Sequence, residues 1–83
     1  MSIPTEINDA FFAGKRSNTI EFVINDTVNV TKGEFEGIEA VVISIASLEP
    51  KVTYLLERFD GAGDITVPQS FIKLVIPSDV GAK

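Results

Sequence analysis

The side chains of this 83-residue chain that could do chemistry are carboxylates, because the sequence contains neither histidine nor cysteine. The commonest general base and the thiol nucleophile are therefore missing, as are the usual nitrogen and sulfur ligands of zinc. Glu57, Asp60 and Asp64 gather around the segment "RFDGAGD", where the two aspartates could share a calcium ion. The spacing of an EF-hand loop is missing, however. We interpret the segment as an Asp-Gly turn with solvated carboxylates, and we expect no catalytic residue, no metal site, no cofactor and no enzymatic activity.

The charge balance is acidic, with seven Lys and Arg against twelve Asp and Glu and a net charge of −5. This charge repels phosphate backbones and argues against nucleic-acid binding. It would steer a basic protein partner toward the chain, although the same charge also serves solubility alone. No segment approaches the roughly 20 apolar residues that span a bilayer, and "MSIPTEINDA" lacks the features of a signal peptide. We therefore expect a soluble, cytoplasmic protein without membrane insertion.

The first 21 residues differ in pattern from the remainder. Ile3, Ile7, Ala10 and Phe11 follow helical spacing in "IPTEINDAFFAGK", and Gly14 suits the end of a helix. The polar stretch "KRSNT" comes next. The sequence thus predicts a short N-terminal helix followed by a linker.

From residue 22 the pattern turns to period two and β-branched residues, which predicts strands at "TVNVT", "AVVISIA", "VTYLLERF", "ITV" and "IKLV". "DGAGD" suits a hairpin turn and "PQSF" a single turn before the last strand. Five short strands are too few for an immunoglobulin-sized sandwich, and a parallel sheet would need helical crossovers. A small, strongly bent barrel fits best. Its expected core consists of Val28, Val30, Val42, Ile45, Val52, Leu55 and Val67.

A motif supports this interpretation. The series Val28-x-Val30-x-x-Gly33-x-Phe35-x-Gly37-x-x-Ala40-x-Val42 resembles the KOW motif of ribosomal proteins and NusG-type transcription factors. The order of the later elements is similar to the remainder of an SH3-like barrel. The resemblance implies a mainly β fold, a five-stranded SH3-like (KOW-type) barrel over residues 22–76, preceded by the helix and linker at 1–21 and followed by a tail at 77–83.

The loop of this motif is acidic. KOW loops that contact RNA carry Lys and Arg, whereas this loop carries Glu34, Glu36 and Glu39 beside Lys32. Small SH3-like barrels also dock protein partners as accessory subunits of electron-transfer complexes, an analogy at the level of the fold. The favoured function is therefore a non-catalytic protein-interaction or accessory-subunit module.

Two other functions remain open. One is a KOW-like RNA-, ribosome- or transcription-associated binder that uses Lys15, Arg16, Lys32 and Lys51. The other is an acidic inhibitor or mimic that occupies a basic site on another protein.

The predicted contact surface combines two connections of the barrel. The loop from Lys32 to Ile38 presents an aromatic ring among glutamates, and Phe59 enters the turn at 60–64. Exposed aromatic side chains are common anchors at interfaces. We expect five residues to lie near each other and to bind a protein partner: Glu34, Phe35, Glu36, Phe59 and Asp60. The adjacent Phe11 and Phe12 of the helix are the next candidates, since only one of them can face the barrel.

Overall fold

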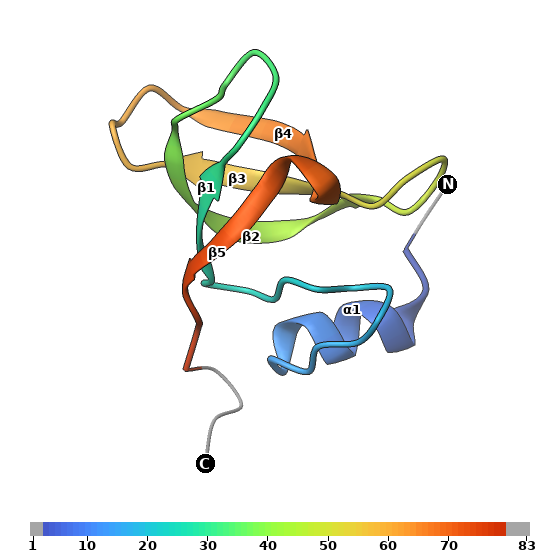
Figure 1. The fold of residues 1–83 in the computed structure, drawn as a ribbon. Coiled ribbons are helices and arrows are strands. Elements are labelled where there is room, and N and C mark those ends of the chain that lie inside the picture. The colour runs from blue at the N-terminus through green and yellow to red at the C-terminus, as the bar shows by residue number, and fades with distance from the viewer. Residues whose placement is uncertain (1–2, 80–83) are drawn as a thin grey trace.

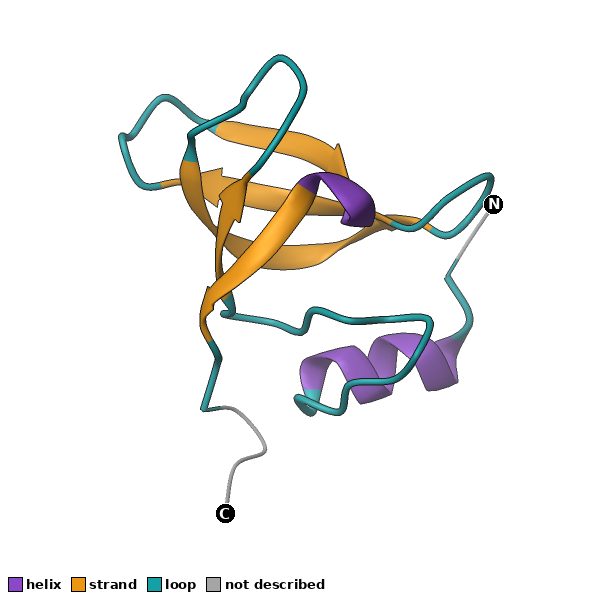
Figure 2. Ribbon diagram, viewed as in Figure 1, coloured by secondary structure: helices purple, strands orange, loops and turns teal. Residues whose placement is uncertain are grey.

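A computed structural model describes residues 3–79 of the chain. It contains one short helix, five strands and a single 3₁₀ turn (Figures 1 and 2). In chain order they are α1 (Thr5–Phe12), β1 (Thr27–Val30), β2 (Glu39–Ser47), β3 (Thr53–Arg58), β4 (Asp64–Pro68), η1 (Gln69–Phe71) and β5 (Ile72–Ile76). The predicted helix, the five strands and the one-turn break before the last strand are confirmed. Of the predicted tail, residues 80–83 lie outside the described part.

The strands form one antiparallel sheet in the order β4-β3-β2-β1-β5. The register of β2 against β3 shifts between Val42 and Ser44 and again between Ile45 and Ser47, and bulges of this kind bend a strand. Figure 2 shows the long β2 curving across the sheet. Within residues 3–79, no ladder joins the edge strands β4 and β5. The structure therefore shows one open sheet and does not show a closed barrel.

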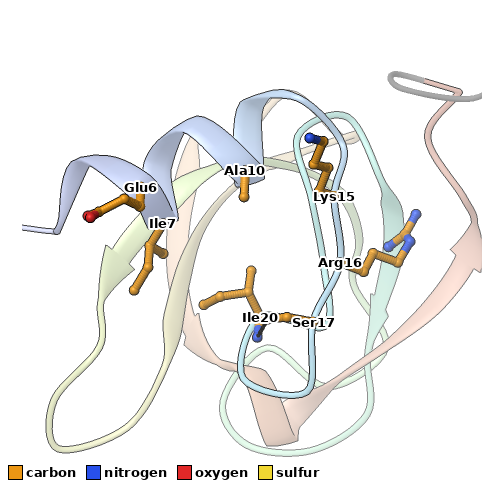
Figure 3. A pocket seen from close by; sticks show the side chains of 7 residues that line it. All are labelled: Glu6, Ile7, Ala10, Lys15, Arg16, Ser17 and Ile20. Atoms are coloured by element: carbon orange, nitrogen blue, oxygen red, sulfur yellow. Dashed lines mark hydrogen bonds between the residues drawn. The ribbon is translucent and has the colours of Figure 1, made fainter.

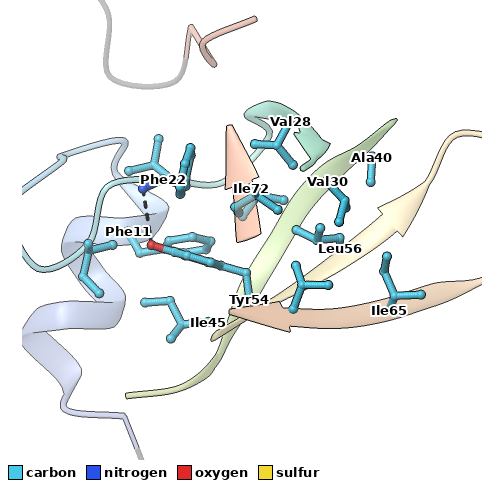
Figure 4. Close-up of a cluster of buried hydrophobic side chains, with 14 residues drawn as sticks. Phe11, Phe22, Val28, Val30, Ala40, Ile45, Tyr54, Leu56, Ile65 and Ile72 are labelled. Atoms are coloured by element: carbon cyan, nitrogen blue, oxygen red, sulfur yellow. Dashed lines mark hydrogen bonds between the residues drawn. The ribbon is translucent and has the colours of Figure 1, made fainter. Parts of the chain in front are cut away.

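The hydrophobic core lies on one side of the sheet, where alternate residues of β1 to β4 point and where β5 contributes Ile72 (Figure 4). Five of the predicted core residues are buried: Val28, Val30, Val42, Ile45 and Val67. Val52 precedes β3 and is partly buried against the core. The prediction for Leu55 is wrong, because Tyr54 and Leu56 are the buried residues of β3 and strand alternation turns Leu55 to the other face.

Helix α1 packs against the same core. Its Phe11 is fully buried and stacks on Tyr54, with ring centroids 6.4 Å apart. Phe22 meets Tyr54 edge-on at 5.7 Å, and the two rings lie beside Phe11 in Figure 4. Phe12 is half exposed, so one phenylalanine of the adjacent pair faces the core, as expected. Because Phe11 belongs to the core of the sheet, the N-terminal segment folds together with the strands.

Candidate functional site

The loop between β1 and β2 carries three of the five predicted contact residues. Two backbone hydrogen bonds close its base, from Gly37 N–H to the Val30 carbonyl at 2.7 Å and from Val30 N–H to the Ile38 carbonyl at 2.8 Å. Phe35 is half-buried and packs against the core, whereas Glu34 and Glu36 are exposed. The aromatic ring of this loop therefore turns inward, and its glutamates remain in solvent.

Arg58 connects Phe35 with Asp60. The guanidinium carbon of Arg58 lies 5.9 Å from the centre of the Phe35 ring. Its Nη2 donates to Asp60 Oδ2 at 2.6 Å and its Nε to Oδ1 at 3.1 Å, while the Ala62 N–H donates to the same Oδ1 at 3.0 Å. The hydrogen bonds from Arg58 and Ala62 hold the pKa of Asp60 below its ordinary value. Asp60 is thus a partner of Arg58.

Phe59 lies at the same end of the sheet but on its other side. It follows Arg58 along the chain, so strand alternation turns its ring away from Phe35. Its N–H donates to the Glu39 carbonyl at 3.1 Å, and 56% of the residue is exposed. The structure thus brings Phe35 and Asp60 together on Arg58, and from the continued pairing of Phe59 with β2 we infer that its ring lies on the opposite side of the sheet. That the five residues bind a partner stays a prediction.

The sequence reasoning missed a buried carboxylate at the start of β1. Asp26 is fully buried and accepts four hydrogen bonds from three separate segments. Arg16 donates through Nη1 to Oδ2 at 2.5 Å and through Nη2 to Oδ1 at 2.8 Å. The backbone N–H of Val23 donates to Oδ2 at 2.9 Å and that of Ser78 to Oδ1 at 2.7 Å. Hydrogen bonds to the Asp26 side chain therefore hold both the linker and the segment after β5.

The electrostatics of Asp26 follow from these contacts. Burial alone would raise the pKa of Asp26, but the hydrogen bonds from Arg16, Val23 and Ser78 outweigh it and the pKa is lowered. The hydrogen bond to Asp26 likewise raises the pKa of Arg16. A paired carboxylate that stays ionised holds the fold together, and it offers no proton for acid–base chemistry at neutral pH.

A second, partly buried network of hydrogen bonds holds the linker against the strands. The hydroxyl of Tyr54 donates to Gln69 Oε1 and accepts the N–H of Phe22 at 3.3 Å. Gln69 Oε1 also accepts the N–H of Glu21 at 2.9 Å, and Gln69 Nε2 donates to the Thr19 carbonyl at 3.1 Å. Burial raises the pKa of Tyr54 to about 12, against the opposing effect of the Phe22 N–H. This hydroxyl is a structural hydrogen-bonding group.

The four basic residues of the nucleic-acid alternative are dispersed. Arg16 is bound to Asp26. The amines of Lys32 and Lys51 each lie near the Phe71 ring, 5.6 and 6.0 Å from its centre. Lys15 lies at the end of α1, where it lines a pocket with other residues (Figure 3).

That pocket lies between α1 and the linker. Its volume is about 190 Å³ and its lining mixes Ile7, Ala10 and Ile20 with charged side chains. Ligand pockets usually measure about 300–1,000 Å³, so this pocket is small for a substrate. Within residues 3–79, no three Asp or Glu side chains are arranged to hold a metal ion.

Comparisons with known proteins give no identification. No family model matches the chain, and no curated protein or solved structure matches it. The resemblance to KOW-type barrels therefore rests on the motif and on the order of the strands. No helix in the described part of the chain is long and apolar enough to cross a membrane.

Proposed function

We propose that this chain is a non-catalytic SH3-like (KOW-type) barrel that acts as a protein-interaction or accessory-subunit module. The strand order and the single turn between β4 and β5 support the barrel, since that turn carries the chain from one edge of the sheet to the other. The motif glycines Gly33 and Gly37 have φ angles of 89° and 92°, which only glycine adopts readily. The KOW-like spacing is therefore accounted for by loop geometry.

The observation that carries the interaction role is the exposure of Phe59. More than half of this residue is in solvent, although its backbone is fixed to β2 by the hydrogen bond to Glu39. A large apolar side chain on a rigid backbone is the kind of residue that dominates binding energy at interfaces. We propose Phe59 as the anchor of the contact surface, which Glu34, Phe35, Glu36 and Asp60 continue around the same end of the sheet.

The test compares two exposed phenylalanines. The purified chain is immobilised and exposed to nuclease-treated lysate, and the retained proteins are identified for the wild type, Phe59→Ala and Phe12→Ala. Phe12 is 50% exposed and lies on α1, so it controls for loss of an exposed ring. We expect one or more proteins to be retained by the wild type and by Phe12→Ala but lost with Phe59→Ala. Equal retention by all three would refute Phe59 as the anchor.

One observation favours the second function, an RNA- or transcription-associated binder. Two lysine amines at one aromatic ring, that of Phe71, form the basic and aromatic combination on which bases of single strands stack. RNA binding with a steep salt dependence that is lost in Lys32→Glu and Lys51→Glu would support this alternative over the first. We expect no such binding, because the chain as a whole carries a charge of −5.

A further inference from the structure

The registers of β2, β3 and β4 show which of their residues lie on the side of the sheet opposite the core. Directly opposite residues of paired strands share a face. The registers place Glu57 between Val41 and Asp64, and the Phe59 N–H continues the β2–β3 pairing to Glu39. Leu55 is on the same side. We call this surface the outer face and define it as Glu39, Val41, Leu55, Glu57, Phe59 and Asp64.

The helix of the described chain lies away from the outer face. Helix α1 packs on the core side, through Phe11 against Tyr54. Val41 and Leu55 are half-buried and Phe59 is largely exposed. The outer face thus combines apolar side chains with carboxylates on a rigid three-stranded support.

Within residues 3–79, no cation is paired with the carboxylates of the outer face. The ion pairs of this part of the chain are Arg16–Asp26 and Arg58–Asp60, so none of its Lys or Arg nitrogens lies within 4.0 Å of Glu39, Glu57 or Asp64. Glu57 and Asp64 are directly opposite each other, and like charges in that position destabilise a sheet. Carboxylates at any surface position would increase solubility. Carboxylates placed opposite each other on paired strands favour, in addition, the binding of a cation from another molecule.

We propose that the outer face docks a basic segment of a partner protein, one that also carries a large apolar side chain. Its Lys or Arg side chains pair with Glu39, Glu57 and Asp64, and its apolar side chain packs on Phe59. A second copy of this chain fits poorly, because it would bring another acidic face against these carboxylates. This inference rests on the proposed function and specifies the chemistry of the partner.

The first test uses peptides of known composition. Two octapeptides, one alternating Lys and Leu and one alternating Glu and Leu, are titrated into the isotopically labelled 83-residue chain and followed by NMR. The Lys–Leu peptide should shift the amide signals of the outer face, leave those of α1 unchanged, and bind more weakly at high salt. The Glu–Leu peptide should have no effect. Absence of binding by the Lys–Leu peptide, or shifts confined to other surfaces, would overturn the proposal.

The second test uses charge reversal. Glu57→Lys and Asp64→Lys should each weaken binding of the Lys–Leu peptide about fivefold, since each removes an ion pair that contributes up to about 1 kcal/mol and puts a repulsive charge in its place. Each should also raise the midpoint of urea unfolding, because it replaces a repulsive cross-strand pair by an attractive one. Asp9→Lys on α1 makes the same change in net charge away from the outer face, and it should leave binding nearly unchanged. Equal weakening by Asp9→Lys would show an effect of net charge alone and overturn the proposal.

Sedimentation of the free chain tests whether a second copy of the chain occupies the outer face instead. A dimer that Glu57→Lys abolishes would assign the outer face to a second copy and contradict the basic partner. A protein that is lost with Phe59→Ala but bound unchanged by Glu57→Lys would leave the proposed function standing and overturn this inference alone.

Discussion

Replacement of Asp26 by Asn tests whether one buried side chain attaches both ends of the described chain to the sheet. The asparagine has nearly the same shape, but it carries no charge and has one acceptor oxygen instead of two. Of the four donors around Asp26, those on one carboxylate oxygen would face an amide NH₂ group. Arg16 and either Val23 or Ser78 would each lose an acceptor.

The expected loss of stability follows from the burial of Asp26 and from the number of its hydrogen-bond partners. A hydrogen bond to a charged group contributes about 1.5–3 kcal/mol, and removing one partner of a buried ion pair costs about 3–5 kcal/mol. The Arg16 side chain is 34% exposed and can return to water, so the lower part of that range applies. We expect Asp26→Asn to lower the free energy of unfolding by about 3 kcal/mol. A chain of this size has a total of roughly 4–12 kcal/mol, so the loss is large.

The pKa of Asp26 also predicts how the stability of the fold depends on pH. The pKa of Asp26 in the folded chain lies below its ordinary value of 3.8, because the hydrogen bonds from Arg16, Val23 and Ser78 outweigh burial. A group with a lowered folded pKa contributes stability above its unfolded pKa and loses that contribution as the pH falls through the folded pKa. The stability difference between the wild type and Asp26→Asn should therefore be full near pH 7 and shrink below about pH 4.

The assay is urea unfolding, followed through the single tyrosine, Tyr54, because the chain has no tryptophan. Asp60→Asn is the matched control, since it removes the charge from the exposed Arg58–Asp60 pair. Its effect should be much smaller and should depend on salt. If Asp26→Asn unfolds at the same urea concentration as Asp60→Asn, or if its deficit persists unchanged into acid, the attachment by Asp26 is refuted.

Three further predictions test the fold. Leu56→Ala should cost about 2–5 kcal/mol in urea unfolding, and Leu55→Ala clearly less; equal costs would contradict the register of β3. Gly33→Ala should destabilise more than Gly61→Ala, because both have positive φ but only at the first would the new Cβ approach an aromatic ring to 2.8 Å. Tyr54→Phe should cost about 1–2 kcal/mol by leaving two polar partners unsatisfied, and the wild-type phenol should titrate near pH 12; a pKa near 10 would contradict its burial.

Most of the fold could be predicted because the local signals agree. The period-two pattern predicts β1, the glycines at 33 and 37 predict the loop that follows it, and "DGAGD" predicts the turn at 60–64. Each prediction depends on neighbouring residues alone, and the structure contains all three elements. The face of β3 could not be read in this way. Tyr54, Leu55 and Leu56 are three consecutive large residues, so the pattern contains no alternation. The stacking of Tyr54 on Phe11, from a distant part of the chain, decides which of them is inside.

The polar contacts were beyond sequence reasoning for a similar reason. Asp26 reads as an ordinary turn residue and Gln69 as part of a short break. Each has a partner far along the chain, with Ser78 52 residues from Asp26 and Glu21 48 residues from Gln69. The opposed carboxylates of Glu57 and Asp64 are likewise visible only once the register of β3 and β4 is known.

The residues that stabilise the fold lie apart from the residues that we propose bind a partner. Asp26, Tyr54 and Gln69 lie on or beside the core, where they attach the linker and the segment after β5, so changes there should affect folding first. Phe59 and Glu57 belong to the outer face, on the side of the sheet opposite the core and α1. In the outer face, improving the cross-strand charge pairing should strengthen the fold and weaken binding of a basic partner. This opposition of the two effects is what distinguishes a recognition surface from a merely solvated one, because a solvated surface would gain stability and lose nothing.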